Sequence, residues 1–234
     1  MFIIQELIEL DKEVLLDLND NHSRFWDCFM WTLTKTITWI PVGAALLYVI
    51  IRNNKLAKTC AILLAIGLCI AFADQITSSF CKPFFERFRP SRDPEIMHMV
   101  HTVNSYKGGM YGFMSSHAAN TFAVAMFVSL LIRSWPLAVI TFTWATAVSY
   151  SRIYLGVHYP GDVLCGAIVG MLIAGLLYCA YYYLFKRKKI DTHRCRLNRY
   201  TSGGYQVAHL NVFYLMFLLT YLGAVVAGIL QFYL

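Results

Sequence analysis

Charged side chains are scarce in this sequence. They make up 14% of the 234 residues, whereas apolar side chains make up 58%. Soluble domains carry about a quarter charged residues, so the composition favours a membrane protein over a soluble one. The formal net charge of +7 lies in short stretches between apolar runs instead of along one soluble face. This distribution argues against a nucleic-acid-binding protein.

The sequence also shows no pattern typical of a signal peptide, of a cysteine framework or of a metal-ligand cluster. Acidic residues interrupt the first 20 positions, and no basic segment precedes an apolar core there, as a signal peptide requires. The seven cysteines form no C-x-x-C pair and lie mostly inside apolar runs, so we expect no structural disulfide. His98 and His101 share a polar loop without an evident third ligand, and we interpret them as solvated. We therefore expect no metal and no other cofactor.

Long apolar segments are abundant instead. A spanning helix needs about 20 residues. The second, fifth and sixth segments reach this length, and the third and fourth are somewhat shorter. An amphipathic stretch at 2–18 precedes them and is typical of a helix on a membrane surface or of an ordinary packing helix. We predict an all-α membrane bundle with about six transmembrane helices and an N-terminal amphipathic helix, forming one domain over 1–234. The six segments are at about 30–51, 56–80, 117–133, 136–150, 162–185 and 209–233.

Basic loops predict the topology. The most basic stretch is 186–199, after the fifth segment, and shorter basic loops follow the first and third segments. With six spans these loops share one side, which the positive-inside rule makes cytoplasmic. The loops 81–116 and 151–161 then face outward. Because 81–116 is basic as well, its charges need another explanation, and a bound anion is a natural one.

The first outward-facing polar cluster is K82-P-F-F-E-R-F-R89-P90. The ammonium of Lys82 and the guanidinium of Arg89 both suit phosphate oxygens. The alternative is a pair of cations that extend from the bundle to the membrane surface.

The second cluster is F113-M-S-S-H117, directly before an apolar run. Ser115 or Ser116 is a suitable helix N-cap, and the free N–H groups of the first turn bind anions. His117 would lie beside such an anion. The alternative is a simple cap followed by a solvated histidine.

The third cluster is S151-R-I-Y-L-G-V-H-Y-P-G-D162. Asp162 follows His158 by four residues, so its carboxylate can accept the Nδ1–H bond and leave Nε2 free to attack. Alternatively, Asp162 only caps the next helix and His158 is a hydrogen-bonded loop residue. That alternative leaves Arg152 without a partner near the membrane.

Together the three clusters place three cations, two histidines, an aspartate and a helix N-terminus on one predicted face. Phosphoryl transfer requires neutralisation of the phosphate charge, an in-line nucleophile and an acid for the leaving group. The clusters therefore favour that chemistry.

The same residues resemble the type 2 phosphatidic acid phosphatase family, also called lipid phosphate phosphatases. The family pattern is K-x(6)-R-P, P-S-G-H and S-R-x(5)-H-x(3)-D. This chain has K82-x(6)-R89-P90, M114-S115-S116-H117 and S151-R152-x(5)-H158-x(3)-D162. The resemblance covers about 56–185, which would be the catalytic core, and leaves 209–233 as an extra helix. Met114 and Ser116 replace Pro and Gly, which affects the expected substrate fit and rate more than the chemistry.

The resemblance implies a role for each matching residue. His158 attacks phosphorus and forms a phosphohistidine, Asp162 orients His158, and His117 protonates the leaving oxygen and then helps water to attack. No metal takes part. The residues expected to hold the phosphate are Lys82, Arg89, Ser115, Ser116, Ser151 and Arg152.

The compact layout resembles bacterial members of the family, which implies a multi-pass protein of the bacterial cytoplasmic membrane. The site would face the periplasm, and the loop 186–199 would be cytoplasmic. By analogy alone, we rank undecaprenyl diphosphate first as substrate, followed by lipid A and then by phosphatidylglycerol phosphate or phosphatidic acid. The alternative outside enzymes is a lipid-binding or transport protein that retains the fold. We expect the bilayer and a lipid phosphate as partners, with no nucleic acid and no obligate protein partner.

Overall fold

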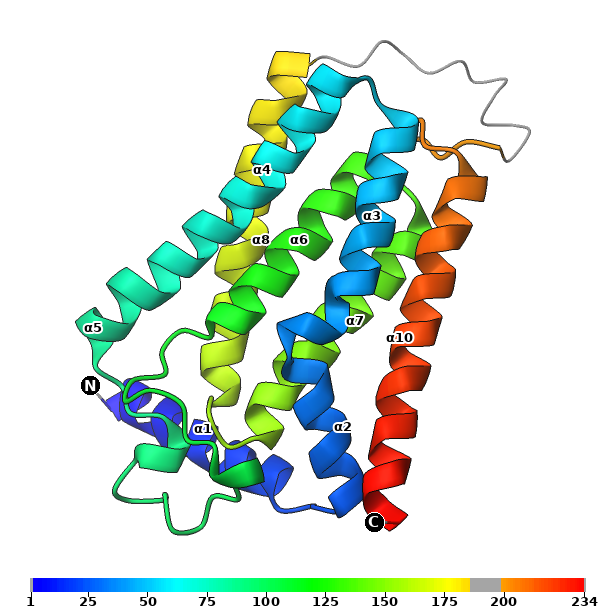
Figure 1. Ribbon diagram of the computed structural model, residues 1–234. Helices are drawn as coiled ribbons and strands as arrows, with labels where there is room; N and C mark the ends of the chain where they lie inside the picture. The colour runs from blue at the N-terminus through cyan, green and yellow to red at the C-terminus, as the bar shows by residue number, and fades with distance from the viewer. Residues whose placement is uncertain (1, 186–198, 234) are drawn as a thin grey trace.

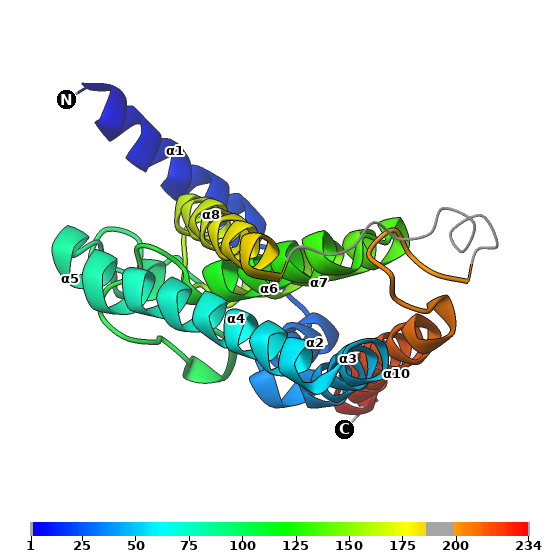
Figure 2. The ribbon, with the colours of Figure 1, turned by 90° about the horizontal axis from the view of Figure 1, so that it is seen from above.

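The computed structural model describes residues 2–185 and 199–233 of the chain, and this part is all-α. Long helices run side by side, and the first helix lies across one end of them (Figure 1). That first helix, α1 (Phe2–Asn19), docks through the buried Leu15 against Ile153 and Tyr159. Its N-terminal part projects from the edge of the bundle (Figure 2). The predicted amphipathic helix is thus a packing helix that also carries exposed apolar side chains such as Leu7.

The first predicted apolar segment is divided into two helices, α2 (Arg24–Thr34) and α3 (Ile40–Asn53), by a 3-10 turn. Lys35 is extended, with φ −74° and ψ 127°. The hydroxyl of Thr38 donates to the carbonyl of Thr32 at 2.7 Å, and the indole of Trp39 donates to that of Leu33 at 2.8 Å. These two bonds satisfy carbonyls at the end of α2 that have no partner within the helix.

The second segment is longer than predicted. α4 (Leu56–Asp74) continues through a π-helical stretch, Gln75–Cys81, into α5 (Lys82–Phe85). The wider π turn changes the direction in which later side chains point, and such turns are common at functional sites. Here it directs Thr77 and Ser78 toward the start of α6, as described below.

Among the described helices, α6 (Ser116–Ile132) and α8 (Pro160–Phe185) make the most extensive contact with each other. Gly170 of α8 lies so near Ala119 that a Cβ there would overlap the Ala119 carbonyl, and a Cβ at Gly166 would overlap the carbonyl of Ser115. Small residues allow two membrane helices to approach in this way. The starts of α6 and α8, which carry two of the predicted polar clusters, are therefore held together.

Two further helices complete the bundle. α7 (Trp135–Tyr154) packs beside α6. α10 (Val207–Tyr233) packs against α2 and α3, and these three helices gather on one side (Figure 2). Phe217 of α10 belongs to the main apolar core, where its ring lies 5.6 Å from that of Trp39. The predicted extra C-terminal helix is therefore an integral part of the bundle.

Within the described residues, four helical stretches are long and apolar enough to cross a membrane, while α6 is apolar but shorter. They are Thr36–Asn53, Leu56–Phe85, Pro160–Phe185 and Val207–Gln231. The turn between α3 and α4 and the start of α10 lie at one end of the bundle, and α1 and the loop after α5 lie at the other (Figure 1). This arrangement agrees with the predicted grouping of loops. The basic stretch 186–198 is outside the described residues.

Gly170→Ala is expected to destabilise the protein by about 1–3 kcal/mol, because the added methyl group overpacks the contact between α6 and α8. The Tm in detergent should fall accordingly. Gly175→Ala on the same helix is the matched control, since nothing lies within 4 Å of a Cβ at that position. An unchanged Tm for Gly170→Ala would show that the two helices can separate without cost.

Candidate functional site

The predicted histidine and aspartate lie together in the structure. His158 is in the turn between α7 and α8, and Asp162 is in the first turn of α8. Nδ1 of His158 is 3.4 Å from Oδ2 of Asp162, and both side chains are buried, at 2% and 0% exposure. The same carboxylate oxygen accepts the backbone N–H of Tyr159 at 3.1 Å. Because Nδ1–H donates to Asp162, Nε2 is the unprotonated nitrogen of the ring.

Arg89 contacts that nitrogen directly. Its Nη1 donates to Nε2 of His158 at 2.9 Å and to the carbonyl of Val157 at 2.9 Å. Burial, followed by the charges of Arg89, Arg152 and Lys82, lowers the pKa of His158 well below its usual range. The imidazole is therefore neutral at physiological pH and has a lone pair on Nε2, as a nucleophile requires.

The middle cluster meets the π turn of the preceding helix. Ser116 has its hydroxyl oxygen 2.7 Å from Nζ of Lys82, 2.9 Å from the hydroxyl of Thr77 and 2.9 Å from that of Ser78. Lys82 also donates to Ser78 at 3.1 Å. The residue that replaces the family glycine thus joins a hydroxyl network that fixes the ammonium group.

Ser115, the residue before Ser116, is the N-cap of α6. Its hydroxyl accepts the N–H of Ala118 at 3.4 Å, and its own N–H donates to the carbonyl of Asp162 at 3.0 Å. This second bond connects the start of α6 to the start of α8. The predicted N-cap, left open between Ser115 and Ser116 by the sequence, is Ser115.

Arg152 and His117 complete the cationic surroundings. Arg152, in the last turn of α7, is 3% exposed and donates to the hydroxyl of Thr34 at 2.8 Å. Its guanidinium carbon lies 5.6 Å from the ring centroid of Tyr106. His117, in the first turn of α6, is close enough to Arg152, His158, Arg89 and Lys82 for their charges to act on it. Two histidines and three cations therefore share one electrostatic environment.

Ser151 has a different orientation from the one expected of a phosphate donor. Its hydroxyl donates to the carbonyl of Val148, one turn back in the same helix, at 2.6 Å. The hydrogen of this hydroxyl is thus engaged inside α7. The expected role of Ser151 in holding phosphate stays a prediction.

Arg87 and Asp11 are important residues that sequence reasoning missed. Arg87 donates through Nη1 to Oδ1 of Asp162 at 3.0 Å and through Nη2 to Oδ2 of Asp11 at 2.8 Å. Its guanidinium carbon lies 4.0 Å from the ring centroid of Tyr159. Asp11 of α1 also accepts the N–H of Gly161 at 2.7 Å, at the start of α8. The buried carboxylate of Asp162 is therefore neutralised by Arg87, which α1 holds in turn.

The sequence contains one indication of Arg87, namely its two-residue spacing from Arg89. α5 ends at Phe85 and Glu86 is left-handed, with φ 45°, after which the chain is extended and Phe88 pairs with Tyr111. Alternate residues of an extended segment share a face, so Arg87 and Arg89 point to the same side. The contact with Asp11 has no such signal, because 76 residues separate the two positions.

The site brings cationic side chains and a helix N-terminus close to His158. Arg89, Arg152, Lys82 and the free N–H groups of α6 can surround a phosphate, while Nε2 of His158 faces the same cations. Among the residues that the structure describes, no group of three metal-ligating side chains converges here, and Asp162 is already paired with Arg87.

Comparison with known proteins identifies the class to which this site belongs. Residues 58–186 match the PAP2 superfamily, so the chain belongs to that superfamily, and the predicted resemblance to lipid phosphate phosphatases is confirmed. The protein is a lipid phosphate phosphatase, a hydrolase. The matched region contains all three polar clusters and corresponds closely to the predicted core of 56–185.

Particular relatives narrow the comparison. A lipid A 4′-phosphatase of Bacteroides thetaiotaomicron is 41% identical over 192 residues, covering 81% of this chain and 85% of the relative. A lipid A 4′-phosphatase of Porphyromonas gingivalis is 33% identical over 79% of this chain and 78% of the relative. An undecaprenyl-diphosphatase of Sulfolobus acidocaldarius is 29% identical over 63% of this chain and 66% of the relative.

The fold is also found in a solved structure. The transmembrane PAP2-type phosphatidylglycerolphosphate phosphatase of Bacillus subtilis matches with a TM-score of 0.55 and 21% identity, over 80% of this chain and 90% of that one. At this identity the likeness concerns the fold alone. It agrees with the apolar helices described above, and the protein is a multi-pass membrane protein.

Arg87→Gln is expected to lower kcat/KM for a lipid phosphate by up to about 100-fold, because a misplacement of about 1 Å in a catalytic group can cost that much. The loss should fall mainly on kcat, since Arg87 bonds to Asp162. Steady-state phosphate release in detergent micelles measures both constants. Arg92→Gln is the matched control, because Arg92 is exposed and donates to the carbonyl of Gly108. If both variants match the wild type, Arg87 does not position the site.

Proposed function

We propose that this protein removes the 4′-phosphate of lipid A through a phosphohistidine on His158. The observation that carries this substrate is the extent of similarity to the two lipid A 4′-phosphatases, which reaches about four fifths of the chain. The undecaprenyl-diphosphatase match covers less of the chain at lower identity. Undecaprenyl diphosphate, ranked first from the sequence, therefore becomes the second candidate.

In the first step, Nε2 of His158 attacks phosphorus while Asp162 holds Nδ1–H. The N–P bond forms as the bond between phosphorus and the 4′ oxygen breaks, and His117 gives its proton to that oxygen. Nη1 of Arg89 donates to Nε2 in the structure, so a phosphate oxygen must accept this bond in place of Nε2 before the attack. Binding of phosphate thus releases the nucleophile.

In the second step, water attacks the phosphohistidine. His117, now neutral, takes a proton from the water, the N–P bond breaks and inorganic phosphate leaves. Splitting the reaction in two in this way is the usual advantage of covalent catalysis. The negative charge of the bound phosphate favours the protonated form of His117 that the first step requires.

The phosphate itself would be held by cations from three elements. Lys82 comes from α5, Arg89 from the extended segment after it, and Arg152 from the end of α7. Ser115 and Ser116 stand at the helix N-terminus, whose free N–H groups point at an anion. The charge and the donors match a phosphate monoester, and none of these groups needs a metal ion.

For the membrane, we propose six spans, formed by α3, α4 with α5, α6, α7, α8 and α10. The end that carries Arg52 and Lys55 would face the cytoplasm by the positive-inside rule, together with the loop 186–199. The starts of α6 and α8, which carry residues of the proposed phosphate site, lie at the opposite end, where α1 crosses the bundle (Figure 1). In the cytoplasmic membrane of a bacterium, that end faces the periplasm and is level with the lipid headgroups.

The purified protein in excess EDTA is expected to release phosphate from lipid A, and mass spectrometry of the product should show that the 4′ position is lost. His158→Asn should reduce the rate by at least about 1000-fold, in the range found when a catalytic nucleophile is removed. Undecaprenyl diphosphate and phosphatidylglycerol phosphate are assayed in parallel.

Release from undecaprenyl diphosphate alone would favour the second candidate. Release from none of the three, with binding of lipid A retained, would identify a lipid-binding protein that keeps the fold. Full activity of His158→Asn would remove this residue as the nucleophile, whichever lipid is the substrate.

His117→Ala is expected to lose less activity with p-nitrophenyl phosphate than with lipid A, because nitrophenolate leaves without a proton from an acid. The second step still needs a base, so the variant should show a burst of nitrophenol and accumulate phosphoenzyme. Rapid-mixing absorbance measures the burst. Equal losses with both substrates would show that His117 is not the leaving-group acid. The control is His98→Ala, which changes an exposed histidine at the same end of the protein.

A further inference from the structure

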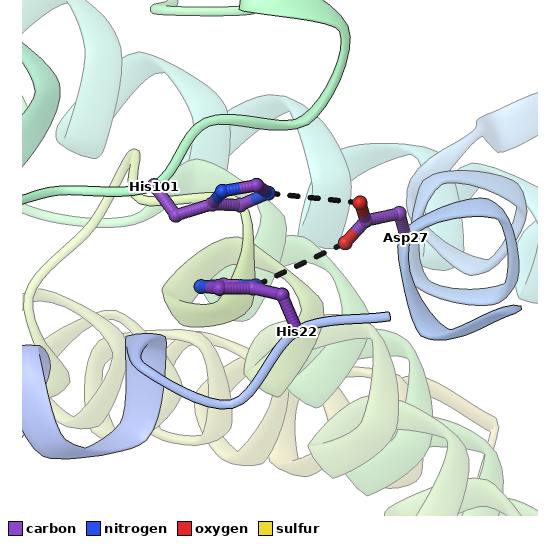
Figure 3. Close-up of side chains that lie close together, drawn as sticks. All are labelled: His22, Asp27 and His101. Atoms are coloured by element: carbon purple, nitrogen blue, oxygen red, sulfur yellow. Dashed lines mark ion pairs between the residues drawn. The ribbon is translucent and has the colours of Figure 1, made fainter. Parts of the chain in front are cut away.

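A second group of reactive side chains lies outside the phosphate site. His22 lies between α1 and α2, Asp27 is in the first turn of α2, and His101 is in the long loop between α5 and α6. Figure 3 shows the two imidazole rings stacked on each other with the carboxylate beside both. Their centroids are 3.6 Å apart and their planes differ by 25°. His22 and Asp27 thus lie beside His101 from distant positions in the sequence, whereas His98 is not part of this cluster.

Three ring nitrogens in this cluster lack hydrogen-bond partners. Nδ1 and Nε2 of His22 and Nε2 of His101 are buried without one among the described residues. The nearest carboxylate oxygens of Asp27 are 3.9 Å from Nδ1 of His22 and 3.6 Å from Nε2 of His101. Buried polar atoms without partners are costly, and such cases indicate a ligand or another special role.

We propose that His22, Asp27 and His101 bind one divalent transition-metal ion, with Zn²⁺ as the best-suited ion. One donor atom from each residue lies within 4.8 Å of the others. A tetrahedral zinc with bonds of about 2.0–2.2 Å places its ligands about 3.3–3.6 Å apart. Donor shifts of about 1 Å, together with a tilt of the two stacked rings that points both lone pairs at the ion, are therefore needed to form the site. Two imidazoles and one carboxylate favour zinc over magnesium or calcium, which prefer oxygen ligands. Water completes the coordination.

Bonds from outside the ligand set hold two of the three ligands in place. Asp27 accepts the hydroxyl of Tyr154 at 2.7 Å. The backbone N–H of His101 donates to Oδ1 of the buried Asn19 at 2.8 Å, and Nδ2 of Asn19 donates to the carbonyl of Tyr154 at 2.8 Å, so these bonds position the loop that carries His101. Outer partners of this kind are typical of metal sites, where they fix ligand orientation.

The ion would tie the loop before α6 to α2 behind the phosphate site. Val103, two residues after His101, packs against Leu33 and Tyr154. Tyr106 follows, and its ring lies beside the guanidinium of Arg152. A metal on His101 therefore stabilises the segment that covers Arg152, while phosphoryl transfer itself proceeds without it. For this reason, an effect of EDTA on the rate would not by itself show a catalytic metal.

The test is metal binding by the full-length protein without a polyhistidine tag. The protein is stripped with EDTA, exchanged into metal-free detergent buffer and titrated with Zn²⁺ by calorimetry, and bound zinc is counted by mass spectrometry. We expect one zinc per chain and a higher Tm when it is bound. His101→Ala and His22→Ala should each bind at least 10-fold more weakly and lose the zinc-dependent rise in Tm.

His98→Ala is the matched control, because His98 is exposed in the same loop, and it should bind as the wild type does. Titration with Co²⁺ distinguishes this site from the cysteines, since the absorption spectrum should lack a thiolate charge-transfer band. Two variants are used so that misfolding of one does not decide the result. Absence of bound zinc in the wild type, a thiolate band, or wild-type affinity in the folded variants would overturn the proposal.

Discussion

The burial of one carboxylate, that of Asp162, determines much of this structure. An ionised group without solvent exposure must be paired and hydrogen-bonded. Asp162 obtains a cation from Arg87, a backbone N–H from Tyr159 and the ring of His158. Each partner comes from a segment that is thereby fixed around the start of α8. His158, the proposed nucleophile, is aligned by the same contacts that make the buried charge tolerable.

These contacts require close packing of the helix starts. Gly166 and Gly170 allow α8 to approach α6, which brings the N–H of Ser115 onto the carbonyl of Asp162. The start of α6 and the turn that carries His158 therefore share one rigid frame. The lipid-facing sides of the helices need only be apolar, and this division between a rigid polar end and an apolar shaft suits an enzyme that takes its substrate from a bilayer.

The sequence predicted local features well and distant ones poorly. The four-residue spacing of His158 and Asp162 fixes their contact in any helix start, and apolar length located most of the helices. The pairing of Asp11 with Arg87 depends on where α1 docks, which no periodicity encodes. The break before α3 was missed because its capping bonds arise from side chains that also suit a continuous helix. His101 was interpreted as a solvated residue because its possible co-ligands precede it by more than 70 positions.

Under the proposed mechanism, the hydrogen bond from Arg89 to Nε2 of His158 would also make the resting nucleophile selective. A lone pair that already accepts a charged donor reacts poorly with neutral electrophiles, and burial keeps most of them away from the ring. Only an incoming group with anionic oxygens can compete for the guanidinium and free the nitrogen. Under that mechanism, the cation that binds the phosphate would also protect the histidine from acylation and alkylation until a phosphate displaces it from Nε2.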